Sequence, residues 1–172
     1  MSLRKLIISQ LFLLAFFVGT SQAATVPVCA SCEAQTITQA LSIAVAHDTI
    51  LLKKGTYKSV ALEVKMPLTF LGETGAIMDG ENESYILKIL SDSVHVSGIT
   101  FINAGRSYTK DYAAIYLSRA KYFSIVDNII RDPFFGILIE KSHYGRITNN
   151  TVTSNRVRED DSGNGVHAWH CS

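Results

Sequence analysis

The chain of 172 residues has few charged side chains and no excess of either sign. Lys and Arg number 16 and Asp and Glu number 15, which gives a formal net charge of +1. A nucleic-acid-binding domain usually gathers its Lys and Arg on one face or stripe, whereas the basic residues here are scattered and no aromatic-basic interleaving occurs. The composition therefore predicts no nucleic-acid partner.

The sequence also lacks an apolar run long enough to span a membrane. Its first apolar stretch, residues 6–18, follows two basic residues and contains two polar ones. This stretch is shorter than the roughly 20 residues that a spanning helix needs, so a membrane anchor is the weaker interpretation. The small-residue site Ser21-Gln22-Ala23 comes next. The arrangement is typical of a secretory signal peptide, which we expect to comprise residues 1–23.

Cysteine is scarce, with three residues in the chain. In an oxidising compartment at most two of them pair within the chain, which leaves one thiol over. Cys29 and Cys32 lie in residues 24–35, a segment expected to be mobile because it precedes the first helix. Two thiolates at this spacing are suited to a soft metal such as Cu(I), so Cys29 and Cys32 are the candidate metal ligands. A disulfide or a redox pair is an open alternative.

Internal repeats predict the fold. Residues 114–117 align with 136–139 at an offset of 22, and the same offset places Asn128 on Asn150. A third copy begins at Gly165, after a polar insertion. Such periods are typical of stacked coils, in which insertions loop out at one recurring corner. Because short segments with alternating apolar residues cannot bury that face alone, the coils are expected to stack as an all-β, right-handed parallel β-helix.

A short capping helix is expected before the first coil. Thr36 and Gln39 form a capping-box pattern. The apolar residues that follow helical spacing are Ile37, Ala40, Leu41, Ala44 and Val45. We interpret this helix as a lid that protects the first coil from pairing with another chain. Strands are expected over residues 49–52, 61–64 and 68–71, with a turn over 54–57.

The predicted β-helix domain spans residues 36–172. No second lid is visible in the sequence, which stops at His170-Cys171-Ser172. An uncapped solenoid end exposes core and unpaired backbone, so further coils are expected beyond Ser172.

Motifs along the chain resemble those of known proteins. Residues 37–57 resemble the opening of many pectin-lyase-like β-helices. Four later motifs, at 67–72, 77–80, 134–137 and 162–169, resemble the NosD family of periplasmic proteins for nitrous oxide reductase maturation. That resemblance implies a non-enzymatic periplasmic protein that acts in copper delivery with an ABC transporter and a copper chaperone or the reductase.

His167, His170 and Cys171 form a second group of residue types that bind copper. Strand alternation from Val166 turns His167 outward and His170 the other way, unless the chain turns there. The alternation therefore argues against a metal site in this group.

The repeat register also predicts an aromatic strip on the outer face of one sheet. It places Tyr116, Leu138 and His167 in one row, with Trp169 beside Glu140 in the next. Such a strip is suited to contact a sugar or a protein. The loops 105–112 and 154–163 flank the same corner, which makes this edge the expected protein-docking surface.

Carbohydrate binding or polysaccharide degradation is the main alternative function, because β-helices host many activities. A polysaccharide lyase would need a stacked acidic column for calcium and a basic residue. The acidic residues fall at different places in the coil pattern, namely Asp79, Asp92, Asp127 and Asp132. We therefore assign no catalytic residue. A structural or adhesive β-helix is the third alternative.

Overall fold

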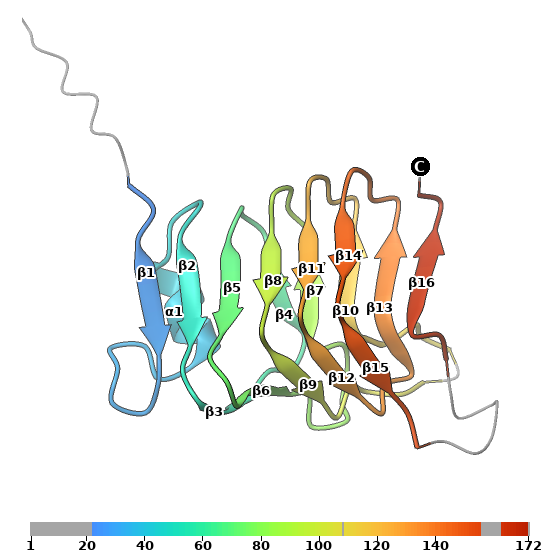
Figure 1. Cartoon of the computed structure of the whole chain (residues 1–172), viewed down its shortest axis with the longest axis horizontal. Coiled ribbons are helices and arrows are strands. Elements are labelled where there is room, and N and C mark those ends of the chain that lie inside the picture. The colour runs from blue at the N-terminus through green and yellow to red at the C-terminus, as the bar shows by residue number, and fades with distance from the viewer. Residues whose placement is uncertain (1–21, 108, 156–162, 172) are drawn as a thin grey trace, which may run out of the picture.

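The computed structural model describes residues 22–107, 109–155 and 163–171. Within these ranges the strands pair in parallel and wind into a right-handed β-helix with one six-stranded and two five-stranded sheets (Figure 1). The predicted fold class is confirmed. The helix α1 (Ile37–Ile43) lies at the end of the solenoid where β1 (Thr25–Val28) and β2 (Thr49–Leu52) are found.

Each coil contributes one strand to each sheet. The first sheet contains β1 (Thr25–Val28), β2 (Thr49–Leu52), β5 (Thr69–Gly72), β8 (His95–Ser97), β11 (Ser124–Val126) and β14 (Arg146–Thr148). The second contains β3 (Gly55–Lys58), β6 (Ala76–Asp79), β9 (Thr100–Ile102), β12 (Ile129–Arg131) and β15 (Thr151–Thr153). The third contains β4 (Leu62–Val64), β7 (Leu87–Ile89), β10 (Ala113–Ser118), β13 (Phe135–Glu140) and β16 (Val166–Trp169).

The predicted repeat register is confirmed. Ile115 pairs with Ile137, which pairs with Val166 on the following coil. Equivalent residues of successive coils therefore stack into columns inside the solenoid. One such column, in the first sheet, consists of Ile50, Phe70, Val96 and Ile125, all fully buried. Each side chain of this size contributes about 1.5–3 kcal/mol when buried, so stacking provides the core that no single coil could form.

An asparagine ladder links neighbouring coils at one corner. Asn128 accepts a hydrogen bond from the Ile99 amide at 3.1 Å and donates from its own side chain to the Asn150 side chain at 3.0 Å. A left-handed backbone conformation lies one residue before each asparagine, at Asp127 (φ 56°) and Asn149 (φ 55°). The asparagine side chains therefore provide the ladder, and the residues before them make the bend.

Helix α1 begins with the predicted capping box, in which the Thr36 side chain accepts from the Gln39 amide and the Gln39 side chain accepts from the Thr36 amide. Ile37 and Ala40 are buried against the first coil. The prediction that Val45 belongs to this apolar face is wrong, because the helix ends at Ile43 and Val45 is 53% exposed.

Two expectations near the N-terminal end need correction. Part of residues 24–35, expected to be mobile, forms β1, which pairs with β2. Residues 55–57, expected in a turn, belong to β3, which pairs with β6. Tyr57 on this strand is buried, and its hydroxyl donates to the Val28 carbonyl at 2.7 Å. The contact ties β3 to β1, so the start of the described chain is packed into the solenoid.

The expected signal peptide falls almost wholly outside the described residues, which begin at residue 22. Across the described ranges, no helix is long and apolar enough to cross a membrane.

Candidate functional site

The first candidate site is the cysteine pair between β1 and α1. Cys29 and Cys32 form a disulfide, and both residues are half-buried. The Cys32 amide donates to the Cys29 carbonyl at 3.1 Å, and the Cys29 amide donates to the Ala34 carbonyl at 3.2 Å. These bonds make a tight loop that holds both sulfur atoms together at the capped end of the solenoid.

The oxidation state decides what this pair can bind. Cu(I) is bound by thiolates, and the sulfur atoms of a disulfide are not thiolates. Of the three alternatives left by the sequence, the structure shows the disulfide. Copper binding at Cys29 and Cys32 stays a prediction, and it requires that the disulfide be reduced.

The second group of copper-binding residue types is not brought together. The Cys171 thiol points to the Ile139 carbonyl, with the sulfur 3.6 Å from that oxygen. The His170 ring instead stacks on Trp169 at a centroid distance of 5.9 Å. His167 contacts Asn164 through its Nδ1 atom at 2.8 Å. Among the described residues, no group of three or more His, Cys, Asp or Glu side chains is placed to hold a metal ion.

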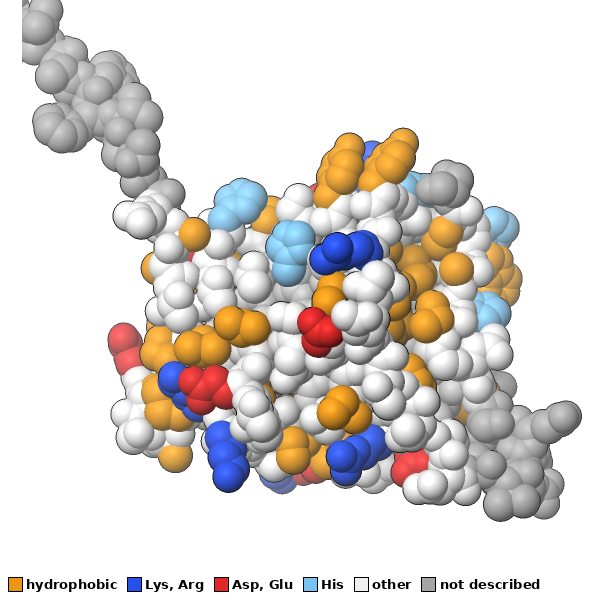
Figure 2. Space-filling model, viewed as in Figure 1, with side chains coloured by type: hydrophobic (Ala, Val, Ile, Leu, Met, Phe, Trp, Pro, Cys, Tyr) orange, Lys and Arg blue, Asp and Glu red, His pale blue; other side chains and the backbone are white. Residues whose placement is uncertain are grey.

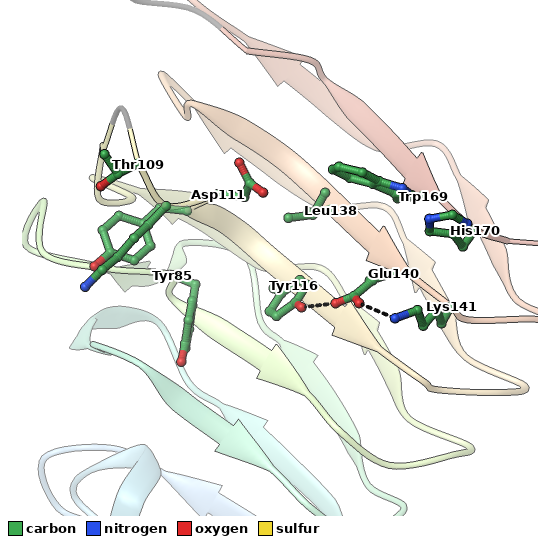
Figure 3. A pocket seen from close by; sticks show the side chains of 11 residues that line it. Tyr85, Thr109, Asp111, Tyr116, Leu138, Glu140, Lys141, Trp169 and His170 are labelled. Atoms are coloured by element: carbon green, nitrogen blue, oxygen red, sulfur yellow. Dashed lines mark hydrogen bonds and ion pairs between the residues drawn. The ribbon is translucent and has the colours of Figure 1, made fainter.

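The direction of the His170 side chain is set by a turn of the chain, the stated exception to strand alternation. The chain turns after β16, and His170 takes a left-handed conformation with φ 53°. This turn brings its ring to the same side as Trp169, where both line one groove (Figure 3).

That groove lies on the outer face of the third sheet and has a volume of about 570 Å³. Its floor is formed by strands β10 and β13, and the loop before β10 forms one wall. The residues that line it are Tyr85, Thr109, Lys110, Asp111, Tyr112, Tyr116, Leu138, Glu140, Lys141, Trp169 and His170. Figure 3 shows Tyr85 and Trp169 at opposite ends, with Tyr116 and Leu138 between them.

Aromatic rings dominate the groove, which we call the aromatic groove. The Tyr85 ring meets Tyr112 edge-on at a centroid distance of 6.3 Å and lies 6.0 Å from the Tyr116 ring. Leu138 is 5% exposed and closes the floor, whereas Trp169 is 52% exposed. Aromatic pairs at such distances hold one another in place, so the tyrosine end of the groove is pre-formed.

Polar contacts fix the floor. The Tyr116 hydroxyl donates to Glu140, whose carboxylate also pairs with Lys141 at 3.2 Å. Burial raises the pKa of Tyr116, and the hydrogen bond to Glu140 adds to this shift. Conversely, the pKa of Glu140 is lowered, mainly by the hydrogen bond from Tyr116 and secondly by the one from Lys141. Glu140 is therefore held as a carboxylate at neutral pH.

Lys88 on β7 contacts the rings at the tyrosine end of the groove. Its ammonium lies 5.1 Å from the centre of the Tyr85 ring and 5.8 Å from that of Tyr116, within cation–π range. Burial lowers the pKa of Lys88, but hydrogen bonds to Tyr85 and Glu63 outweigh it, so the net shift is upward. The ammonium stays charged and keeps both rings in position.

The repeat register predicted much of this groove. Tyr116, Leu138 and His167 do form one cross-strand row, and Glu140 pairs with Trp169. Loop 105–112 provides Lys110, Asp111 and Tyr112, as the expected flanking loop. Tyr85 was missed because it precedes β7, in a coil whose repeat was not recognised. Most of the second flanking loop, residues 156–162, lies outside the described residues. Protein docking at this edge stays a prediction.

On the face seen in Figure 2, acidic and basic side chains are scattered, with no broad area of one sign. This agrees with the near-zero net charge of the chain.

Comparison with known proteins identifies relatives. The Pseudomonas aeruginosa protein named "Probable ABC transporter binding protein NosD" is 29% identical over 108 residues, covering 62% of this chain and 25% of that protein. The Stutzerimonas stutzeri protein of the same name is 28% identical over 123 residues, covering 70% of this chain and 28% of that protein. The chain therefore spans about a quarter of the length of these relatives.

Among solved structures, pectin methylesterase from Aspergillus niger in deglycosylated form matches 86% of this chain and 67% of its own, with 18% identity and a TM-score of 0.34. No function is inferred from this likeness. The family described as "Periplasmic copper-binding protein (NosD)" matches residues 47–172. That match covers most of the chain, including every coil from β2 onward. The chain therefore belongs to the NosD family.

Proposed function

We propose that this chain is part of an exported periplasmic accessory protein that binds copper and works with an ABC transporter in the maturation of nitrous oxide reductase. The observation behind the proposal is the NosD family match over residues 47–172, since that family is described as periplasmic and copper-binding. The relatives named as ABC transporter binding proteins support the transporter partner. The resemblance of the loop motifs supports the link to the reductase. No residue of this chain is given a catalytic role.

Copper binding by this chain is proposed at reduced Cys29 and Cys32. The two sulfur atoms are held within one short loop, and paired thiolates suit Cu(I). The pair precedes residue 47, so the family match does not itself cover it. What supports the pair is its donor chemistry and its place at the surface end of the fold. Opening of the disulfide by a periplasmic thiol reductant is the step that exposes the ligands.

The partner proposal is tested by affinity capture of the full-length protein from its host membrane, with and without Cu(I), followed by mass spectrometry. The expected result is recovery of the subunits of an ABC transporter. The recovered amount is expected to differ between the samples with and without Cu(I). A matched bait carrying the double substitution Cys29→Ser and Cys32→Ser separates copper-dependent from copper-independent capture. Recovery of no transporter subunit in any state would contradict the proposed partner.

A further inference from the structure

The aromatic groove plays no part in the proposed copper chemistry. Its described residues offer three tyrosine rings and one tryptophan, and no cluster of metal-ligating side chains. The Tyr85 ring contacts the rings of Tyr112 and Tyr116, whereas Trp169 is half exposed at the far end (Figure 3). An exposed indole beside ordered phenols is a surface prepared for a ligand with an apolar face.

The charge in the groove is balanced. Asp111 and Glu140 supply two carboxylates, whereas Lys110 and Lys141 supply two ammonium groups. The Lys88 ammonium behind the tyrosine rings is itself paired with Glu63 at 3.3 Å. Glu140 is already bonded to Tyr116 and Lys141. A cleft attracts a charged ligand when one sign lines it, and this one has no such lining. The groove therefore favours a neutral ligand over a polyuronate, a nucleic acid or a polycation.

The edges of the groove are rich in hydrogen-bonding groups. The side chains of Thr109, Lys110 and Asp111 line the wall, and His170 lies at the end beside Trp169. A site with apolar ring faces and a few placed polar groups suits a ligand that has both kinds of surface. A neutral sugar has them, because its ring presents C–H groups on its faces and hydroxyl groups around its rim. We propose that the aromatic groove binds a neutral oligosaccharide.

The spacing of the rings indicates more than one sugar unit. Tyr116 lies on β10 and Trp169 on β16, with β13 between them. Neighbouring strands are about 4.8 Å apart, so two strand intervals separate these residues by about 10 Å across the sheet, and Trp169 lies two positions further along its strand than the row of Tyr116. Leu138 on β13 forms an apolar floor in the interval. Two stacking positions with an apolar surface between them suit a short chain of sugars.

The size of the groove also favours an oligosaccharide over a folded protein partner. Its volume of about 570 Å³ lies in the range of small-molecule sites, which is roughly 300–1,000 Å³. A stable protein interface instead buries about 800 Å² on each partner. This proposal does not rest on the copper proposal, since the two use different residues.

The chain carries its own reporter for the test, because Trp169 is the single tryptophan in the sequence. The unmodified full chain is titrated with neutral tetrasaccharides (cellotetraose, maltotetraose and chitotetraose) and with the acidic tetragalacturonate, while the fluorescence of Trp169 is followed. The expected result is a saturable change with at least one neutral tetrasaccharide and none with tetragalacturonate. A flat response to every neutral sugar, or a preference for tetragalacturonate, would overturn the proposal.

Two variants locate the binding. Tyr116→Ala removes one of the two stacking rings and is expected to weaken the affinity by about 10-fold, the effect of one lost stacking contact. Tyr144→Ala is the matched control, because Tyr144 is 72% exposed and lies outside the groove. It is expected to bind as the unmodified chain does. Circular dichroism confirms that both variants are folded. Equal affinity of Tyr116→Ala and the unmodified chain would show that the sugar binds elsewhere.

Discussion

The Tyr116 hydroxyl on β10 donates a hydrogen bond to the Glu140 carboxylate on β13. The two residues lie on neighbouring coils, since Tyr116 pairs in register with Leu138, two positions before Glu140. This diagonal contact joins two coils across the floor of the aromatic groove. It also couples the charge of Glu140 to the position of an aromatic ring.

Replacement of Tyr116 by Phe tests this coupling. The variant keeps the ring but removes the donor whose hydrogen bond is the main cause of the lowered Glu140 pKa. We expect the Glu140 pKa to rise toward its ordinary value, which carboxyl-detected NMR titration measures. Tyr122→Phe is the control, because Tyr122 is 58% exposed and stacks on Tyr144 instead. An unchanged Glu140 pKa in Tyr116→Phe would show that the contact does not form in solution.

The asparagine ladder is expected to contribute strongly to stability. Asn128 is 1% exposed, and its side chain bonds to the Ile99 amide and to the Val96 carbonyl. Asn128→Leu keeps the volume but leaves these buried backbone groups without partners. The expected loss is about 2–3 kcal/mol in the free energy of unfolding, measured with urea.

A matched substitution on the surface gives the comparison. Asn155 is exposed, so Asn155→Leu is expected to change the unfolding free energy by no more than about 0.5 kcal/mol. If both variants lose the same stability, the ladder is not what holds the corner together.

Asp48 makes the fold sensitive to acid. Its carboxylate accepts hydrogen bonds from the Ala24 amide at 2.7 Å and the Val45 amide at 2.8 Å. Both hydrogen bonds lower the pKa of Asp48, the one from Val45 more than the one from Ala24, and they outweigh the opposing effect of burial. A carboxyl group whose pKa is lower in the folded state than in the unfolded state stabilises the fold at pH values above its unfolded pKa of about 3.9. This contribution disappears as the pH falls through the pKa of the folded state.

Asp48→Asn is therefore expected to be less stable than the unmodified chain at pH 7. The difference between the two should shrink as the pH falls below about 4, where the unmodified chain loses the same contribution. Thermal unfolding followed across this pH range measures it. A difference that stays constant with pH would assign the effect to packing instead of charge.

The sequence was sufficient for the fold because the repeats are regular in the central coils. Ile115, Ile137 and Val166 share one apolar position, and the register follows from their alignment. The first coil was predicted less well. The residue types of Gly55 and Thr56 predict a turn, yet both residues pair with β6 and belong to β3. Here tertiary pairing outweighs local propensity.

The site was partly predictable for the same reason. Tyr116 and Trp169 lie in regular strands, so their outward direction follows from alternation. His170 follows the strand end, where one left-handed residue reverses the direction that alternation predicts. Tyr85 comes from a connection before β7, and connections carry no periodic signal that would place a side chain. The pairing of Cys29 with Cys32 depends on redox state, which spacing does not fix.

The proposed copper role is tested most directly by a Cu(I) competition titration of the disulfide-reduced chain against a chromophoric chelator. The reduced chain is expected to take Cu(I) from the chelator and the oxidised chain to take less. The Cys29→Ser, Cys32→Ser variant is expected to take no more than the oxidised chain. Cys171→Ser serves as the control for the remaining thiol and should bind as the reduced chain does. Equal binding by the double variant and the reduced chain would contradict the assignment of copper to Cys29 and Cys32.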